Sequence, residues 1–103
     1  SADFRPYIKN VVIDGLTIVQ SKDDPKVNEY IQVYDRVENL FLKNVIVSSD
    51  KDAKKTESFI GFKAFKNCDR LGKIGNLVTH DIYMPNVNNL VTQPMLVEHK
   101  ANT

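Results

Sequence analysis

One strand-like pattern occurs three times along the chain. The segment NVVIDGLTI at 10–18 aligns with NLFLKNVIV at 39–47, so that Asn10 lies 29 positions before Asn39. The same offset places EYIQV at 29–33 on SFIGF at 58–62, across polar loops of similar length and charge. A third copy, NLVTHDIYM, begins at Asn76, 37 positions after Asn39. An offset shared by strands and loops indicates a repeating structure.

Within each copy the apolar residues are spaced by two, three and two positions. They are Val11, Ile13, Leu16 and Ile18, then Leu40, Leu42, Val45 and Val47, and then Leu77, Thr79, Ile82 and Met84. Alternation by two predicts a half-buried strand, and the spacing of three predicts a corner after which the same face stays inward. Gly15, Asn44 and Asp81 occupy this corner, and these residue types accept a left-handed backbone at least cost. The pattern therefore predicts two short strands joined at a corner.

A strand, a corner, a second strand, a polar loop and a third strand resemble one rung of a right-handed parallel β-helix of the pectin-lyase-like superfamily. NVVIDGLTI and NLFLKNVIV carry the resemblance most clearly. It implies an all-β fold, a right-handed parallel β-helix fragment of about three rungs. An antiparallel β-sandwich is the alternative, because Gly, Pro and Asn also recur near the spacing of sandwich turns. The predicted organisation is one β domain over 1–103, repeats at about 8–36, 37–67 and 74–84 onward within 7–84, and a cap or tail at 85–103.

Composition limits the classes of partner. The chain has 103 residues with 14 Lys plus Arg and 13 Asp plus Glu, and its net charge of +1 argues against a nucleic-acid partner. No apolar run approaches the roughly 20 residues that span a bilayer, so no membrane partner is expected. The single cysteine excludes an internal disulfide.

The resemblance implies polysaccharide-related functions, since the enzymes of the superfamily are mostly polysaccharide lyases and glycoside hydrolases. Their usual catalytic motifs are absent here. The predicted function is thus a non-catalytic polysaccharide-recognition or structural segment of a tailspike-like or adhesin-like protein, extracellular or on a virion surface. The alternatives are a polysaccharide lyase or glycoside hydrolase fragment, and an oligomerisation module. Open ends of a short solenoid predict a homo-oligomer or part of a longer chain.

Three residues at equivalent outward positions are the catalytic candidates. Asp14, Lys43 and His80 are expected to stack in one column. A carboxylate, an ammonium and an imidazole at close range can abstract and donate protons. The alternative is an exposed ladder with a surface ion pair, which contributes little to stability.

Two further sets of candidates concern ligands. Tyr34, Phe41 and Tyr83 are predicted to lie outward or at corners, where an aromatic ring can stack on a sugar, although such rings also pack under loops or subunits. Asp23, Asp50 and Asp52 offer oxygen ligands for calcium between repeats. Neighbouring lysines favour a solvated charged loop instead, so no cofactor is expected and calcium is the one candidate ion.

Overall fold

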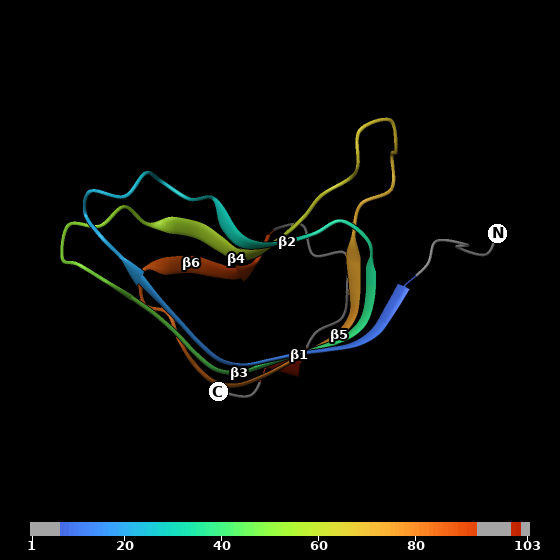
Figure 1. Ribbon diagram of the computed structural model, residues 1–103, viewed down its shortest axis with the longest axis horizontal. Helices are drawn as coiled ribbons and strands as arrows, with labels where there is room; N and C mark the ends of the chain where they lie inside the picture. Colours follow the sequence, from blue (N-terminus) through green and yellow to red (C-terminus); the bar gives the residue numbers. More distant parts are fainter. Residues whose placement is uncertain (1–6, 93–99, 102–103) are drawn as a thin grey trace.

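The computed structural model describes residues 7–92 and 100–101 and shows an all-β chain (Figure 1). No helix occurs in the part of the chain that the structure describes, so none there could cross a membrane. The strands are β1 (Tyr7–Gln20), β2 (Glu29–Val33), β3 (Arg36–Ser49), β4 (Thr56–Phe62), β5 (Lys73–Tyr83), β6 (Val87–Val91) and β7 (Lys100–Ala101).

The strands form two parallel sheets between which the chain alternates. One sheet has the order β1-β3-β5-β7 and the other has the order β2-β4-β6. Each repeat therefore contributes one long strand to the first sheet and one short strand to the second, and the repeats lie against one another in Figure 1. All strand pairs in the described residues are parallel, so the antiparallel sandwich alternative is wrong.

The register between the strands is the one that the repeats predict. Asn10 pairs with Asn39, which pairs with Asn76, and the offsets of 29 and 37 are thus confirmed. The third repeat continues through β6, where Val87 pairs with Thr56 at an offset of 31 (87 − 56). This strand lies in the stretch predicted as a cap or tail. The turn before it is closed by the Val87 amide, which donates to the Met84 carbonyl at 3.2 Å.

The predicted corners are present, but they bend the strands without ending them. Gly15, Asn44 and Asp81 have φ angles of 88°, 53° and 57°. All three lie inside continuous strands of 14, 14 and 11 residues. The left-handed conformation at each corner changes the direction of the strand, and the residue types found there are those that tolerate this conformation best.

The core lies between the two sheets and is densest in the middle repeat. Leu40, Leu42, Val45 and Val47 are all buried, as predicted from the two-three-two spacing. Phe59 and Ile60 from β4 and Ile74 and Leu77 from β5 are also fully buried. Since every repeat supplies the same inward positions, these residues stack in columns that cross the repeats.

The offset between the second and third repeats is 37, compared with 29 between the first and second. The additional residues form a projecting loop between β4 and β5 (Figure 1). The loop is closed at its base by the Gly72 amide, which donates to the Lys63 carbonyl at 2.7 Å. A Cβ atom at Gly72 would lie 1.9 Å from the Val33 carbonyl oxygen, so only glycine fits there. The additional residues thus leave the stacked sheets undisturbed.

Candidate outer-face site

The outward side chains of β1, β3 and β5 form a regular array before the corner. We define the outer-face array as three columns of three residues, namely Asn10, Asn39 and Asn76, then Val12, Phe41 and Val78, and then Asp14, Lys43 and His80. Neighbouring strands lie about 4.8 Å apart, and alternate residues along a strand lie about 6.6 Å apart. The array is therefore a continuous patch on one face of the four-stranded sheet.

The first column is an asparagine ladder. The Asn39 side-chain amide donates to Asn10 Oδ1 at 3.0 Å, and the Asn76 amide donates to Asn39 Oδ1 at 2.9 Å. Both hydrogen bonds run in the same direction along the stack. The repeat places these asparagines at one position, and their recurrence is a signal in the sequence for a hydrogen-bonded ladder.

The third column contains the catalytic candidates. Asp14 pairs with Lys43 and Lys43 pairs with His80, so the predicted stacking is confirmed. All three side chains are exposed. The column therefore presents a carboxylate, an ammonium and an imidazole to solvent in that order.

Corner residues hold the two ends of this column. Asn44 Nδ2 donates to Asp14 Oδ1 at 2.8 Å, and His80 Nδ1 lies 2.8 Å from Asp81 Oδ2. No ion pair joins Lys43 to Asp14 or to His80 in the described residues. The sequence predicted Asn44 and Asp81 only as backbone corners, and their position directly after the column was the signal for a second role.

The three aromatic candidates lie in three different places. Phe41 is half-buried at the centre of the outer-face array, between the columns of Asn39 and Lys43. Tyr83 is 61% exposed and lies beyond the corner, in the outward column that contains Ile46. Tyr34 lies outside the strands and packs on Phe65 of the projecting loop, with ring centroids 4.9 Å apart. Only Phe41 is thus surrounded by polar groups of the array.

Of the three acidic loop candidates, Asp50 bonds to a backbone group. Asp50 Oδ2 accepts a hydrogen bond from the Lys22 amide at 3.2 Å, which ties the loop after β1 to the loop after β3. Asp23 and Asp52 are exposed in these loops. The described residues contain no group of three or more His, Cys, Asp or Glu side chains that could hold a metal ion.

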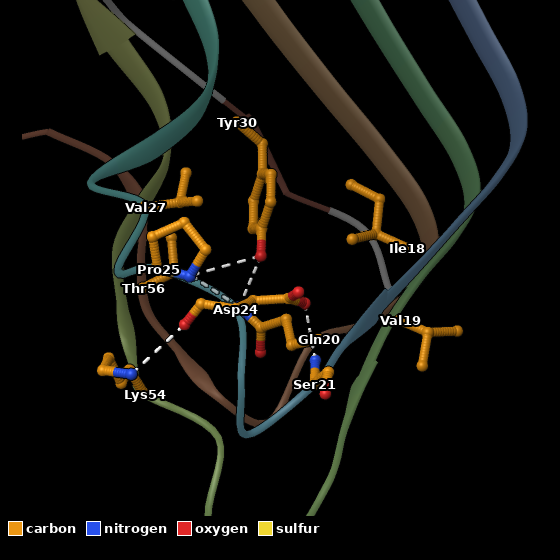
Figure 2. A pocket seen from close by; sticks show the side chains of 10 residues that line it. All are labelled: Ile18, Val19, Gln20, Ser21, Asp24, Pro25, Val27, Tyr30, Lys54 and Thr56. Atoms are coloured by element: carbon orange, nitrogen blue, oxygen red, sulfur yellow. Dashed lines mark hydrogen bonds between the residues drawn. The ribbon is translucent and has the colours of Figure 1, made fainter.

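A pocket of about 190 Å³ lies between the end of β1 and the start of β2 (Figure 2). Its polar centre is Gln20, which is only 6% exposed. The Gln20 amide nitrogen donates to Tyr30 Oη and to Thr56 Oγ1, both at 2.5 Å, and Gln20 Oε1 accepts from Asn86 Nδ2 at 2.9 Å. These bonds join all three repeats. The polar groups at the centre of the pocket are therefore already paired within the protein, as buried amides generally are.

One ion pair connects the second sheet to the base of the projecting loop. Lys63 Nζ lies 2.6 Å from Glu29 Oε1, and Gln32 Nε2 donates to the same oxygen at 3.2 Å. The hydrogen bond from Lys63 lowers the pKa of the Glu29 carboxyl below its ordinary value, against the opposing effect of burial. The same contact raises the pKa of Lys63. A Cβ atom at Gly61 would lie 2.9 Å from Glu29 Cγ, so the glycine makes room for this pair.

Comparisons of the chain with protein-family models, with curated proteins and with solved structures find no match. A function for the chain is therefore inferred from the geometry of the outer-face array.

Proposed function

We propose that the chain is a segment of a right-handed parallel β-helix that recognises a polysaccharide through the outer-face array. The alternation of the chain between two parallel sheets supports the architecture, as does the constant offset between β1 and β3. Extended polysaccharides also repeat along one direction. A face on which equivalent positions recur at every strand spacing is suited to such a ligand.

The setting of Phe41 carries the proposal. Its ring lies between an amide column and a charged column, with Asn39 and Lys43 as its outward neighbours along β3. A sugar ring has an apolar face of C–H groups and an edge of hydroxyl groups. An aromatic ring flanked by hydrogen-bonding side chains matches both, because the ring takes the apolar face while the amide and ammonium groups reach the hydroxyls.

The experiment is a titration of the isotopically labelled chain with neutral and acidic polysaccharide fragments, followed by amide chemical shifts. The expected result is saturable shifts centred on β3 near Phe41. Phe41→Ala is expected to weaken binding by about tenfold or more. The control is Val19→Ala on β1, because Val19 is apolar, 67% exposed and outside the array. Absence of binding, or equal binding by both variants, would contradict the proposal.

The contact between His80 and Asp81 favours a second candidate function, a polysaccharide lyase or glycoside hydrolase. A carboxylate at His80 Nδ1 holds that nitrogen as the donor and leaves Nε2 as the proton acceptor. Lys43 and Asp14 continue the same column. The test measures release of unsaturated or reducing ends from acidic polysaccharides by the parent chain and by His80→Ala. Activity that His80→Ala abolishes supports this candidate, and an inactive parent chain removes it.

Exposed apolar side chains on the outer face favour a third candidate, an assembly module that forms a homo-oligomer. Val12, Ile46 and Tyr83 are all more than 40% exposed on β1, β3 and β5. Such side chains on adjacent strands are typical of protein contacts. Sedimentation equilibrium at micromolar concentration tests this candidate, and a monomer would remove it. Either a polysaccharide ligand or an assembly role is consistent with the expected extracellular or virion-surface location.

A further inference from the structure

At one end of the stack, the edge strand of each sheet comes from the first repeat. β1 is the edge of the four-stranded sheet and β2 is the edge of the three-stranded sheet. Both belong to the first repeat, so their outer N–H and C=O groups face the same end of the stack. This end is a different surface from the outer-face array, so pairing at this end does not require polysaccharide binding.

The β1 edge lacks the features that protect exposed edges. Protected edges are short, or carry proline, bulges or several charges. β1 has 14 residues without proline, and Lys9 and Asp14 are its charged residues. Its offset from β3 stays at 29 from Tyr7 to Gln20, so the pairing contains no bulge. The edge is therefore regular enough to pair with another strand over its whole length.

The core columns are incomplete at this end. Ile8 is 55% exposed, while the next members of its column, Val37 and Ile74, are 9% and 0% exposed. The four inward residues of β1 after Ile8 are half-buried, although their partners on β3 are fully buried. The residues of β3 differ by having a strand on each side. One more strand beside β1 would complete every column.

The asparagine ladder also indicates a missing neighbour at this end. Asn39 and Asn76 each donate to the asparagine of the preceding repeat. Asn10 accepts from Asn39, and its own side-chain amide has no acceptor among the residues that the structure describes. The next acceptor in this series would be a side-chain oxygen one strand spacing beyond β1.

We infer that the β1 and β2 end binds one further repeat of the same kind, parallel to β1 and in register with it. Its strand carries Asn beside Asn10, Gly, Asn or Asp beside Gly15, and apolar residues beside the inward residues of β1. The parallel direction is that of every strand pair in the described residues, and the added strand must also turn where β1 turns (Figure 1). The pocket beside Ile18 and Tyr30 would then lie inside the stack, where an apolar side chain of the added repeat can enter it (Figure 2).

Two lengthened chains test the inference. In one, a copy of residues 8–36 is inserted before Ile8, and in the other the insert is a copy of residues 37–65, which has the same length of 29 residues and the same register. Hydrogen exchange is measured at the amides of the original β1 that point away from β3. Exchange at these amides is expected to slow by about tenfold or more relative to the parent chain, toward the rates of β3.

The control is the first lengthened chain with Ile13→Asp and Leu16→Asp in the inserted copy alone, which should leave the original β1 unprotected. Unchanged exchange in both lengthened chains overturns the inference. Equal slowing in the control also overturns it, and so does a parent chain whose β1 amides are already as protected as those of β3. A parent dimer in which the β1 amides that point away from β3 are already protected would show that a second copy covers this edge, which contradicts the added repeat.

Discussion

The first and second repeats share one sequence pattern but differ in how deeply they are buried. Leu16 in the first repeat is half-buried, whereas Leu42 in the second is fully buried. Both side chains point inward, Leu16 in the column of Val45 and Leu42 in the column of Ile13, so their own residue type does not explain the difference. β3 lies between β1 and β5, and β1 has β3 on one side only. Burial in this fold is thus set by the neighbouring repeats.

The largest expected effect comes from shortening the same residue type in the two repeats. Leu42→Ala is expected to lower the free energy of unfolding by about 2–5 kcal/mol, because it leaves a cavity in a fully buried column. Leu16→Ala is expected to cost about half as much or less, since part of that side chain is already in water. Urea unfolding of both variants measures the difference. An equal or larger loss for Leu16→Ala would mean that the first repeat has a neighbour in solution.

The second effect concerns the polar residues at the ends of β1 and β3. Gln20→Ala removes one amide that bonds Tyr30, Thr56 and Asn86, and we expect a loss of about 1–3 kcal/mol because buried polar groups are left unpaired. Ser49 is the register partner of Gln20 in the second repeat and is the matched control. Ser49→Ala is expected to change stability by about 0.5 kcal/mol or less. Thermal unfolding followed by circular dichroism compares the two, and similar melting temperatures would show that the Gln20 network is dispensable.

The corners should respond alike in the two repeats. Asn44→Ala and Gly15→Ala each place alanine in a left-handed conformation, which costs roughly 1 kcal/mol. A Cβ atom at Gly15 would meet nothing within 4 Å, so the backbone alone sets its cost. Asn44→Gly is the control and is expected to be close to neutral, apart from the bond to Asp14. Stabilisation by Gly15→Ala in urea unfolding would contradict the left-handed corner.

The smallest effect is the pH dependence of the ion pair between Glu29 and Lys63, which joins the first repeat to the second. The pKa of Glu29 is lowered by folding, so its contribution is complete above its unfolded pKa and is lost as pH falls through the folded pKa. The pKa of Lys63 is raised, so its contribution is complete below its unfolded pKa and is lost as pH rises through the folded pKa.

Because the Lys63 side chain is 39% exposed, water screens the pair, and the pair is expected to contribute about 0.5 kcal/mol. Lys63→Met should flatten this part of the acid limb in a plot of unfolding free energy against pH. Lys66→Met in the same projecting loop is the control, since Lys66 is exposed and has no described ion pair. Identical acid limbs for the two variants would show that the pair does not operate in solution.

The stacking of the long strands follows directly from the sequence. The two-three-two spacing of apolar residues predicts which side chains of β3 are buried, and the residue types at Gly15, Asn44 and Asp81 predict the left-handed corners. The same alignment predicts the column of Asp14, Lys43 and His80, because a parallel register carries every outward position with it. The repeat in the sequence is sufficient to predict these features, because each one depends on a single strand pattern that recurs in every repeat.

Features that join different parts of the repeat could not be predicted in this way. β6 follows a turn at Pro85 that changes the offset to 31, so its pairing with β4 does not continue the register of the long strands. The Gln20 network combines residues from three repeats at unrelated offsets, and a polar residue after Ile18 at an inward position was the one signal for it. Contacts of the corner residues with Asp14 and His80 depend on side-chain geometry that a strand pattern does not contain.

The most direct test of the stacked register is the set of methyl contacts along one inward column. Ile13 pairs with Leu42 and Leu42 pairs with Thr79, so one residue from each repeat meets in this column. Methyl-labelled protein in solution is expected to give nuclear Overhauser effects between Ile13 and Leu42 and between Leu42 and Thr79, and none between Ile13 and Thr79 at short mixing times. Strong contacts between Ile13 and Thr79, or the absence of both predicted contacts in a folded chain, would contradict the parallel stacking of the repeats.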